Sequence, residues 1–392
     1  MPGNDRKKII LLGMLTRHPV AGMVWLTMQY MVGFERLGYE TYYVEAHGGT
    51  PKMFMRASHD GSVPAAAFLD RIMRSFGFHC RWAFHALHSD GTCYGLSRSV
   101  VKKLYESACL VINLHGATTP LPEHTGTGRL VYLGTDPVER EIEVHHKVQE
   151  TIDLLQTHDF HFTWAGNYGN PDCRVPVCRE FDFRKTRQPI VLDLWEGNGS
   201  EADRREVFTT IANWKQLWRE IRFDGEVYHW SKHFEFLKFV DLPRRTVESF
   251  ELALSGCSQK ERQELEGKGW RVRDALVVSR DVHTYRDYVR ESLGEFTVAK
   301  DQNVRLRSGW FSDRSAAYLA AGRPVITQDT GFGNALPTGE GLFAYSDFEG
   351  IEEALGRIGS DYAAHSRAST QIAREYFSHE IVLGGLLSET GN

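Results

Sequence analysis

The chain has 392 residues, of which 42% are hydrophobic and 25% are charged, and its formal net charge is −5. This length is too great for one ordinary core and suits two α/β domains of roughly 150–200 residues each, and the composition excludes a disordered or fibrous protein. The acidic balance gives no signal for a nucleic-acid partner, because proteins that bind duplex DNA usually carry a basic field.

Short sequence patterns argue against a disulfide framework, a metal site and a membrane-spanning helix. The six cysteines are scattered without a CxxC pair, and no Asp-x-Asp pair occurs, so we expect neither a disulfide framework nor a metal site. No run of about 18 apolar residues, which a membrane-spanning helix requires, is present. The polar N-terminus is followed by an apolar run at 9–12 that is too short for a signal peptide. We therefore expect a cytoplasmic protein without a transmembrane segment.

The N-terminal half alternates predicted strands and helices. Residues 8–14 are nearly all apolar, as a buried parallel strand requires, 23–37 have helical spacing, and 40–45 return as a strand. Together these three elements predict a βαβ unit, which opens a doubly wound sheet. The same half contains further helices at 65–76, 97–107 and 139–156 and further strands at 109–114, 129–133 and 160–164.

The local composition changes between the two halves of the chain. Three prolines interrupt a charged stretch at 170–189, and we place the domain boundary there, which divides the chain into 1–185 and 186–392. The C-terminal half repeats the alternation. We expect strands at 208–212, 270–272, 295–299 and 323–327 and helices at 247–254, 283–292, 312–321, 348–358 and 362–377.

The most informative segment is 308–345, which begins with a turn and the start of a helix. Ser308 and Gly309 form the predicted turn, and Ser312 and Asp313 are suited to cap the helix that begins there. Backbone N–H groups and the helix dipole at such a start favour a bound anion, particularly a phosphate. Residues of this kind usually cap a helix and bind no ligand, so a phosphate-binding role depends on the residues that follow them.

Small residues and glycines fill the remainder of this segment. Residues 315–321 are mostly small, so the helix can lie close to its sheet, and Gly322 ends it before a buried strand at 323–327. The next loop contains Gly331, Gly333, Gly339 and Gly341. Glycines permit a close approach of backbone to a ligand, although most glycine loops are only turns. The ordered combination is more specific than any of its parts.

In this order the segment resembles the C-terminal domains of GT-B glycosyltransferases, in particular retaining enzymes of the glycogen-synthase and sucrose-synthase type with a glycosyltransferase family 4-like domain. Those domains carry a run close to PFG…EAMAxGxPVIxxDxGG…LxxGxxGLL. The matching residues of this chain are Phe311, 317–322, 324–326, Asp329, Gly331 and 339–342. Outside this segment the agreement is one of element order alone.

The resemblance implies an α/β protein of the GT-B class, with two doubly wound Rossmann-like domains that face a central cleft. Residues 1–185 would bind the acceptor and 186–392 the nucleotide-sugar donor, with the last helix crossing back to the N-terminal domain. The implied reaction moves a sugar from a UDP-, GDP- or dTDP-sugar to an acceptor hydroxyl, with retention of configuration and with no metal or other cofactor. The acceptor is left open between saccharides, lipids, natural products and macromolecules, as is the oligomeric state.

The chain departs from this family at two positions. The family usually carries two glutamates eight positions apart, one contacting the donor sugar and the other the ribose, where this chain has Gly309 and Ala317. In a divergent enzyme Asp313 or Asp329 would replace one of these contacts. The alternatives are a catalytically inactive GT-B protein with a binding or regulatory role and a GT-B sugar-nucleotide epimerase.

The resemblance also directs attention to a donor site. In this family, basic side chains and backbone amides stabilise the leaving diphosphate, an oxyanion-type role. Lys215 comes after the first strand of the C-terminal half, Lys232 lies further along the chain, and Arg307 directly precedes the turn. The candidate donor-binding residues are Lys215, Lys232, Arg307, Ser308, Gly309, Trp310, Phe311, Ser312 and Asp313.

Acceptor activation is assigned to three residues near N-terminal strand ends, where ligands of a doubly wound sheet bind. His115 directly follows the strand at 109–114, and the ordinary pKa of histidine suits proton transfer near neutrality. Asp136 comes after the strand at 129–133, and His18 lies in the loop after the first strand. His115 and Asp136 each have a simpler reading, as a hydrogen-bonded structural histidine and a turn-capping aspartate.

Overall fold

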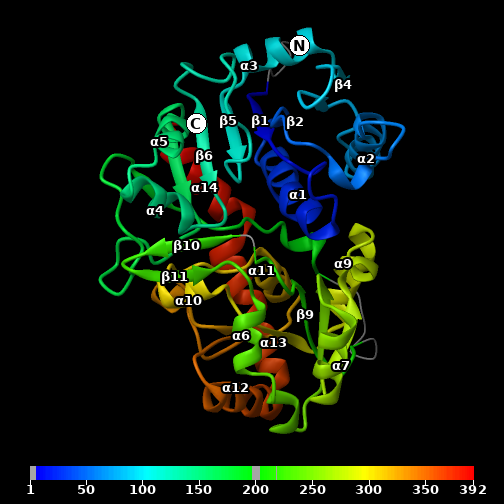
Figure 1. Ribbon diagram of the computed structural model, residues 1–392, viewed down its shortest axis with the longest axis vertical. Coiled ribbons are helices and arrows are strands. Elements are labelled where there is room, and N and C mark those ends of the chain that lie inside the picture. Colours follow the sequence, from blue (N-terminus) through cyan, green and yellow to red (C-terminus); the bar gives the residue numbers. More distant parts are fainter. Residues whose placement is uncertain (1–5, 197–203, 218) are drawn as a thin grey trace.

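The computed structural model describes residues 6–196, 204–217 and 219–392 of the chain (Figure 1). Two sheets lie one above the other along its longest axis, and helices pack around each of them. A two-stranded antiparallel hairpin accompanies them, made of β10 (Glu220–Phe223) and β11 (Glu226–His229).

The first sheet has eight strands in the order β4-β3-β2-β1-β5-β6-β7-β8, and every strand but β4 is parallel to its neighbour. Its strands are β1 (Lys8–Leu12), β2 (Glu40–Glu45), β3 (Trp82–His85), β4 (Cys93–Gly95), β5 (Leu110–Leu114), β6 (Leu130–Gly134), β7 (Phe160–Thr163) and β8 (Phe183–Lys185). The helices of this half are α1 (Ala21–Arg36), η1 (Lys52–Phe54), α2 (Ser62–Ser75), α3 (Arg98–Ser107), α4 (Glu139–His145) and α5 (Gln149–Gln156). Residues 9–12 of β1 are fully buried, because a central parallel strand is covered on both faces.

The second sheet has six parallel strands in the order β13-β12-β9-β14-β15-β16. Its strands are β9 (Phe208–Asn213), β12 (Phe250–Ser255), β13 (Arg271–Asp274), β14 (Gly294–Thr297), β15 (Val325–Gln328) and β16 (Leu342–Tyr345). The helices that come after the first sheet are η2 (Leu192–Leu194), α6 (His233–Lys238), η4 (Leu242–Arg244), α7 (Gln259–Gly267), α8 (Ala275–Val278), α9 (Val282–Glu291), α10 (Asp301–Arg305), α11 (Asp313–Ala320), η5 (Phe332–Asn334), α12 (Phe348–Ser360), α13 (Tyr362–Ile372), the π-helical turn η6 (Ala373–Phe377) and α14 (His379–Glu389).

The chain crosses between the two sheets twice, and the crossings are hydrogen-bonded to each other. Ile190 in the first crossing donates its N–H to the carbonyl O of Phe377 at 2.6 Å and accepts the N–H of His379 at 2.9 Å. Helix α14 then packs on α1, where a Cβ added to Gly33 would lie 2.6 Å from Cδ1 of Leu383. The last helix therefore lies against a helix of the first sheet, while the division of the chain into 1–185 and 186–392 stays a prediction.

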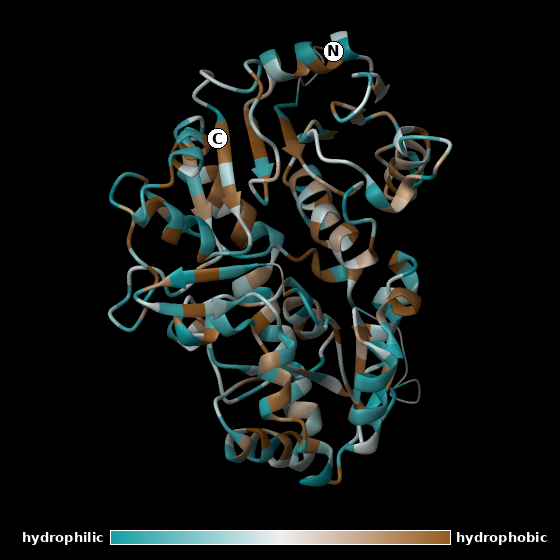
Figure 2. Ribbon diagram, viewed as in Figure 1, coloured by the Kyte–Doolittle hydropathy of each residue, from teal (hydrophilic) through white to brown (hydrophobic). Residues whose placement is uncertain are grey.

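Hydrophobic residues are concentrated in the strands and on the helix sides that face them (Figure 2). One core cluster extends from the first sheet through α1 to α9 and α11, so apolar packing is continuous between the two halves. None of the helices in the described part of the chain combines the length and the apolar character needed to span a membrane.

Two predicted helices are wrong. The helix expected at 139–156 is divided into α4 and α5, because Lys147 between them has a left-handed φ of 59°. Residues 247–254 are not helical, since strand β12 begins at Phe250 and is buried between β9 and β13. A short apolar run fits a buried strand and a buried helix equally well, which explains the second error.

Sequence patterns do not predict β3, β4, β8 or the hairpin. The hairpin turns at Asp224 and Gly225, whose φ values of 49° and 76° are those of a two-residue turn that matches the twist of its strands. Its side chains Ile221, Phe223 and Tyr228 are buried in one cluster with residues of α4. The hairpin thus joins a segment of the C-terminal half to the first sheet's helices.

Candidate active site

The carboxyl ends of the two parallel sheets meet, and side chains from both halves are in contact there. Asp136, after β6, forms an ion pair with Lys300, after β14. Trp310 donates its indole N–H to the carbonyl O of Thr135 at 3.1 Å. Because ligands of doubly wound sheets bind at such strand ends, the candidate site is the region where these contacts join the sheets.

Lys232 is a buried ammonium group without a carboxylate partner. It directly precedes α6, is 8% exposed, and its Nζ lies 5.7 Å from the ring centroid of Trp310. It forms no ion pair with any residue that the structure describes. Burial lowers the pKa of Lys232 well below its ordinary value, and the positive charge of Arg314 acts in the same direction, while the charges of Glu295 and Asp313 oppose the shift. A bound anion would offset both effects, so this lysine is suited to hold one.

Two further cations lie near Lys232, and each already has a carboxylate partner. Lys300 is buried and pairs with Asp136. Arg314, in the first turn of α11, is also buried and donates to Glu295 at 2.5 Å. The charge of the buried Asp313 also acts on Lys232 and Arg314. Of the three cations, Lys232 is the one that forms no ion pair within the described part of the chain.

Lys215 is occupied elsewhere. Its Nζ lies 2.5 Å from Oε1 of Glu261, a residue in the first turn of α7. The same carboxylate oxygen accepts the indole N–H of Trp214 at 3.0 Å. The charge of Lys215 is thus paired on its own side of the molecule, and its assignment to the donor site stays a prediction.

The turn that starts at Ser308 is packed shut. Gly309 donates its N–H to the carbonyl O of Thr330 at 2.7 Å, and Trp310 donates its N–H to Oγ of Ser308 at 3.2 Å. Gly309 has a φ of 77°, and a Cβ there would lie 2.2 Å from the backbone N of Asn167. The glycine serves a close contact between the two halves, while the phosphate cradle expected at Ser308 and Gly309 stays a prediction.

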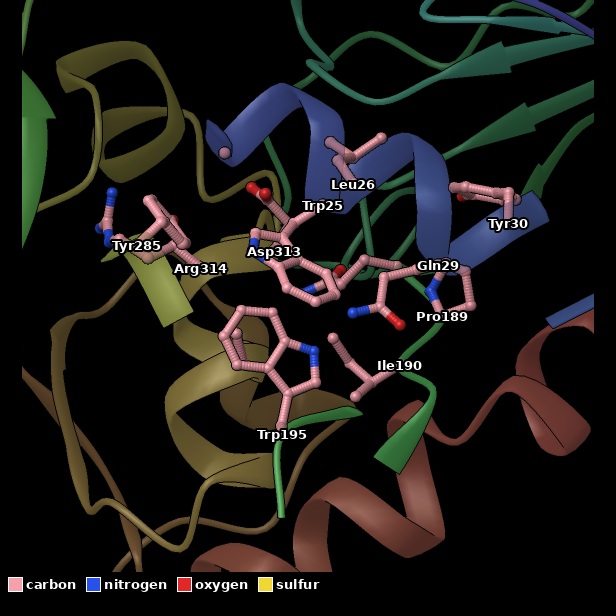
Figure 3. Close-up of a pocket in the computed structure, with 13 residues that line it drawn as sticks. Trp25, Leu26, Gln29, Tyr30, Pro189, Ile190, Trp195, Tyr285, Asp313 and Arg314 are labelled. Atoms are coloured by element: carbon pink, nitrogen blue, oxygen red, sulfur yellow. The ribbon is translucent and has the colours of Figure 1, made fainter. Parts of the chain in front are cut away.

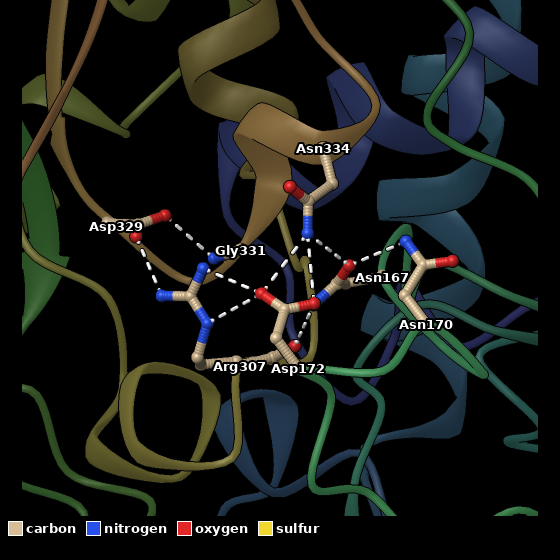
Figure 4. Close-up of polar contacts among 7 residues, drawn as sticks. All are labelled: Asn167, Asn170, Asp172, Arg307, Asp329, Gly331 and Asn334. Carbon is tan, nitrogen blue, oxygen red and sulfur yellow. Dashed lines mark hydrogen bonds and ion pairs between the residues drawn. The ribbon is translucent and has the colours of Figure 1, made fainter.

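Arg307 belongs to a polar network that joins the two halves (Figure 4). Its guanidinium contacts Asp172 at 2.9 Å and Asp329 at 2.8 Å. The other members of the network are Asn167, Asn170, Gly331 and Asn334. In this structure both charged groups have partners, and the roles predicted for Arg307 at a phosphate and for Asp329 at a sugar stay predictions.

Phe311 and Ser312 contact other parts of the folded chain. The ring of Phe311 lies 5.3 Å from that of Phe332 and 5.4 Å from that of Phe377, which places it in the core. Ser312 directly precedes α11, and its side chain accepts no capping hydrogen bond. Its carbonyl O accepts an N–H of Gln188 at 2.9 Å. Phe311 therefore packs in the core, and Ser312 precedes the helix without acting as its side-chain cap, while the donor-binding roles of both residues stay predictions.

Asp313 lines a pocket between the two halves (Figure 3). The pocket is narrow, with a volume of about 10 Å³ that holds about one water molecule, and its wall also contains Ala317, the position of one family glutamate. Burial raises the pKa of Asp313, although the charge of Arg314 opposes the shift. Two buried N–H groups among the lining residues, Nε2 of Gln29 and Nε1 of Trp195, have no hydrogen-bond partner within the described ranges of the chain. The pocket therefore offers one acceptor and two donors.

His115 follows β5 in an uncommon conformation. Its φ is 67°, and its Nδ1 lies 2.6 Å from Oγ1 of Thr135. Burial lowers the pKa of His115 to about 3, and the nearby His18 acts in the same direction. The ring is therefore neutral at pH 7 and a weak base, which does not fit proton abstraction near neutrality. A neutral imidazole still donates or accepts a hydrogen bond.

The loop that carries His18 is fixed by a buried carboxylate. His18 itself is exposed, and partial desolvation and the charge of Arg17 lower its pKa. Glu45, the last residue of β2, is fully buried and accepts the N–H of Thr16 at 3.0 Å and the hydroxyl of Tyr43 at 2.5 Å. Glu45 thus holds the start of the loop in which His18 lies.

Three residues of this region escape the sequence patterns. Lys300 follows β14 as Asp136 follows β6, so the rule of strand ends would have found it. Glu45 ends a strand and carries the same signal, whereas nothing in the sequence shows that Arg314 turns toward the sheet. Among the described residues, no group of three or more His, Cys, Asp or Glu is arranged to hold a metal ion.

Comparison with known proteins relates this geometry to one fold. No protein-family model matches the sequence, and no curated protein is significantly similar to it. An α-glucosyltransferase in complex with UDP aligns over 99% of this chain and 100% of its own, with a TM-score of 0.56 and 10% identity. AviGT4, a glycosyltransferase involved in avilamycin A biosynthesis, aligns over 98% and 97%, with a TM-score of 0.54 and 11% identity.

A third solved structure agrees with these two. Sucrose-phosphate synthase from Thermosynechococcus elongatus aligns over 98% of this chain and 99% of its own, with a TM-score of 0.54 and 12% identity. All three alignments span both sheets. The predicted fold class, α/β of the GT-B type with two doubly wound Rossmann-like sheets, is confirmed.

Proposed function

We propose that the chain is a glycosyltransferase, which moves a sugar from a nucleotide-sugar donor to an acceptor hydroxyl. Its fold is that of solved glycosyltransferases, and residues 308–345 resemble their donor domains in sequence. Residues 186–392 would bind the donor and 1–185 the acceptor. Because UDP is bound in several of the similar structures, a UDP-sugar is the first donor to test, followed by GDP- and dTDP-sugars.

The observation that carries this proposal is the unpaired ammonium of Lys232. Negative charge develops on the diphosphate as the bond to the sugar breaks, and cations already in place stabilise it at no cost of reorganisation. Lys232 would bind a diphosphate oxygen, while Lys300 and Arg314 add positive potential on either side. In this proposal side chains supply the charge, so neither a metal nor another cofactor takes part.

Asp313 would replace one of the two missing family glutamates. Its carboxylate lines the same pocket as Ala317, and a carboxylate there can accept hydrogen bonds from hydroxyls of the ribose or the donor sugar. Retention of configuration is proposed with it, on the sequence resemblance to the glycogen-synthase and sucrose-synthase type.

Acceptor binding would involve the loops at the ends of β1 and β5. His115, neutral at pH 7, would hydrogen-bond the acceptor hydroxyl, and His18 would contact the acceptor from its exposed loop. Asp136 would act through Lys300, whose ammonium it holds in place. The acceptor itself stays open between a saccharide, a lipid, a natural product and a macromolecule.

Isothermal titration with UDP, GDP and dTDP in the presence of EDTA tests the proposal. We expect one of the three to bind, and we expect Lys232→Met to weaken its binding by about 1.5–3 kcal/mol, the range for hydrogen bonds to charged groups. The control is Lys260→Met, because the side chain of Lys260 is 86% exposed on α7. Absence of binding to the unmodified protein, or an equal loss in both variants, overturns the proposal.

Turnover separates the proposal from its alternatives. A donor panel with saccharide acceptors should show sugar transfer or slow donor hydrolysis. Binding without any turnover would indicate an inactive GT-B protein, and conversion of the donor without an acceptor would indicate an epimerase. The missing carboxylates at Gly309 and Ala317 are the reason for this control.

A further inference from the structure

A second group of cations lies where the chain crosses between the sheets, outside the region proposed for the donor and acceptor. A crevice of about 590 Å³, open space included, is bounded by the end of β8, the first crossing, η6 and α14. Its wall includes Lys185 at the end of β8, Thr186 and Arg187 from the first crossing between the sheets, and Tyr376 of η6 from the second crossing. None of these residues belongs to the sites described above.

Arg187 is a half-buried guanidinium without an anionic partner. Its Nη1 is buried and makes no hydrogen bond, and among the described residues Arg187 forms no ion pair. Its guanidinium carbon lies 5.8 Å and 5.9 Å from the ring centroids of Tyr376 and Phe377, which hold the group by cation–π contacts but accept no N–H. Burial lowers the pKa of Arg187, although a guanidinium keeps its charge in proteins. An unmatched charge in this setting is costly unless an anion binds it.

Lys185 adds a second unmatched charge to the same crevice. It ends β8, and its Nζ has one hydrogen-bond partner among the described residues, the amide oxygen of Asn170 at 3.5 Å. Two carboxylates also line the wall. Glu389 pairs with Arg184 at 3.1 Å, and Glu375 accepts a hydrogen bond from a neutral amide outside the crevice and keeps its charge. Within the described part of the chain, neither carboxylate forms an ion pair with Arg187 or Lys185, so both cations can pair with a bound anion.

We propose that this crevice is a binding site for a small molecule that carries a phosphate group, held by Arg187 and Lys185. The planar guanidinium of an arginine can donate two parallel hydrogen bonds to two phosphate oxygens. Two cations also suit the charge of about −1.5 to −2 that a phosphate monoester carries at pH 7. The hydroxyl of Thr186 can donate to a third oxygen. This inference does not depend on the proposed sugar transfer.

The position of the site gives the bound anion a second effect. Arg187 belongs to the first crossing and Tyr376 to the return, and the two crossings are already hydrogen-bonded through Ile190. Arg187 also lines a neighbouring pocket whose wall contains Gly309, at the contact between the two halves. A phosphate on Arg187 therefore binds the folded junction and not the unfolded chain, so it raises Tm by mass action.

Thermal unfolding and isothermal titration of the full chain with inorganic phosphate test the site, with sodium chloride and sodium acetate at equal ionic strength as comparison arms. We expect phosphate to raise Tm more than either comparison anion. Arg187→Met should weaken phosphate binding about tenfold or more, as loss of a charge-assisted hydrogen bond does. Lys185→Met, at an exposed position where folding is not at risk, should weaken it by a smaller factor.

Lys260→Met is the control, because the side chain of Lys260 is 86% exposed on α7 and does not line the crevice. It should bind phosphate as the unmodified protein does, and Arg187→Met should bind nucleotide unchanged. Equal stabilisation by phosphate and chloride overturns the proposal, as does an equal loss of phosphate binding in Lys260→Met. Full phosphate binding in Lys185→Met and Arg187→Met together overturns it as well.

Discussion

Replacement of Gly309 by alanine tests whether its turn serves packing or a ligand. The added Cβ would lie 2.2 Å from the backbone N of Asn167, and no side-chain movement relieves a contact with a backbone atom. An alanine at the φ of 77° also costs about 1–2 kcal/mol, and displacement of the packed segments adds roughly 1–3 kcal/mol. We therefore expect Gly309→Ala to lower the free energy of unfolding by about 2–5 kcal/mol.

Urea denaturation followed by tryptophan fluorescence measures this loss. The matched control is Gly339→Ala, because Gly339 has a φ of 102° and the nearest atom to its Cβ is Nη1 of Arg357 at 3.5 Å, the end of a flexible side chain. The control should lose only the about 1–2 kcal/mol of backbone strain. If Gly309→Ala costs no more than the control, the turn is not packed against Asn167 and the reasoning is refuted.

Two further changes test the histidine and the helix contact. The folded-state pKa of His115, about 3, lies below its ordinary value of 6.5, so the stability that this histidine contributes is present above pH 6.5 and is lost as the pH falls toward 3. Between pH 7 and about pH 4, His115→Gln should therefore lose less free energy of unfolding than the unmodified protein. An equal loss in the two proteins would contradict this. Gly33→Ala should destabilise the protein although it improves helix propensity, because its Cβ meets Cδ1 of Leu383 at 2.6 Å. The control is Gly384→Ala, whose added Cβ meets no atom within 4 Å, and it should raise the free energy of unfolding by up to about 1 kcal/mol. If both variants are more stable than the unmodified protein, α14 does not pack closely on α1.

The sheet architecture is predictable from the sequence because buried parallel strands are apolar runs bounded by turn residues. Strands expected at 109–114 and 129–133 are found as β5 and β6, and His115 and Asp136 lie just beyond their carboxyl ends. The same signal fails for β12, because an apolar run of that length does not distinguish a strand from a helix.

The glycine-rich segment marks the limit of this kind of prediction. The pattern shows that backbone must approach something closely at Gly309 and Gly331, but not what. In the structure Asn167, which is distant in the sequence, occupies both places, and its Nδ2 would lie 2.7 Å from a Cβ at Gly331. Arg307 finds its partner Asp172 across the same interface. Such pairs depend on how the two halves pack, and no local pattern encodes that.

A crystal structure of the protein with bound UDP tests the central claim most directly. We predict a diphosphate oxygen within ion-pairing distance of Nζ of Lys232, with Arg307 still bound to Asp172 and Asp329. A diphosphate held instead by the backbone at Gly309, with Arg307 released from both carboxylates to bind it, would contradict the assignment of the donor site to the cations at the strand ends.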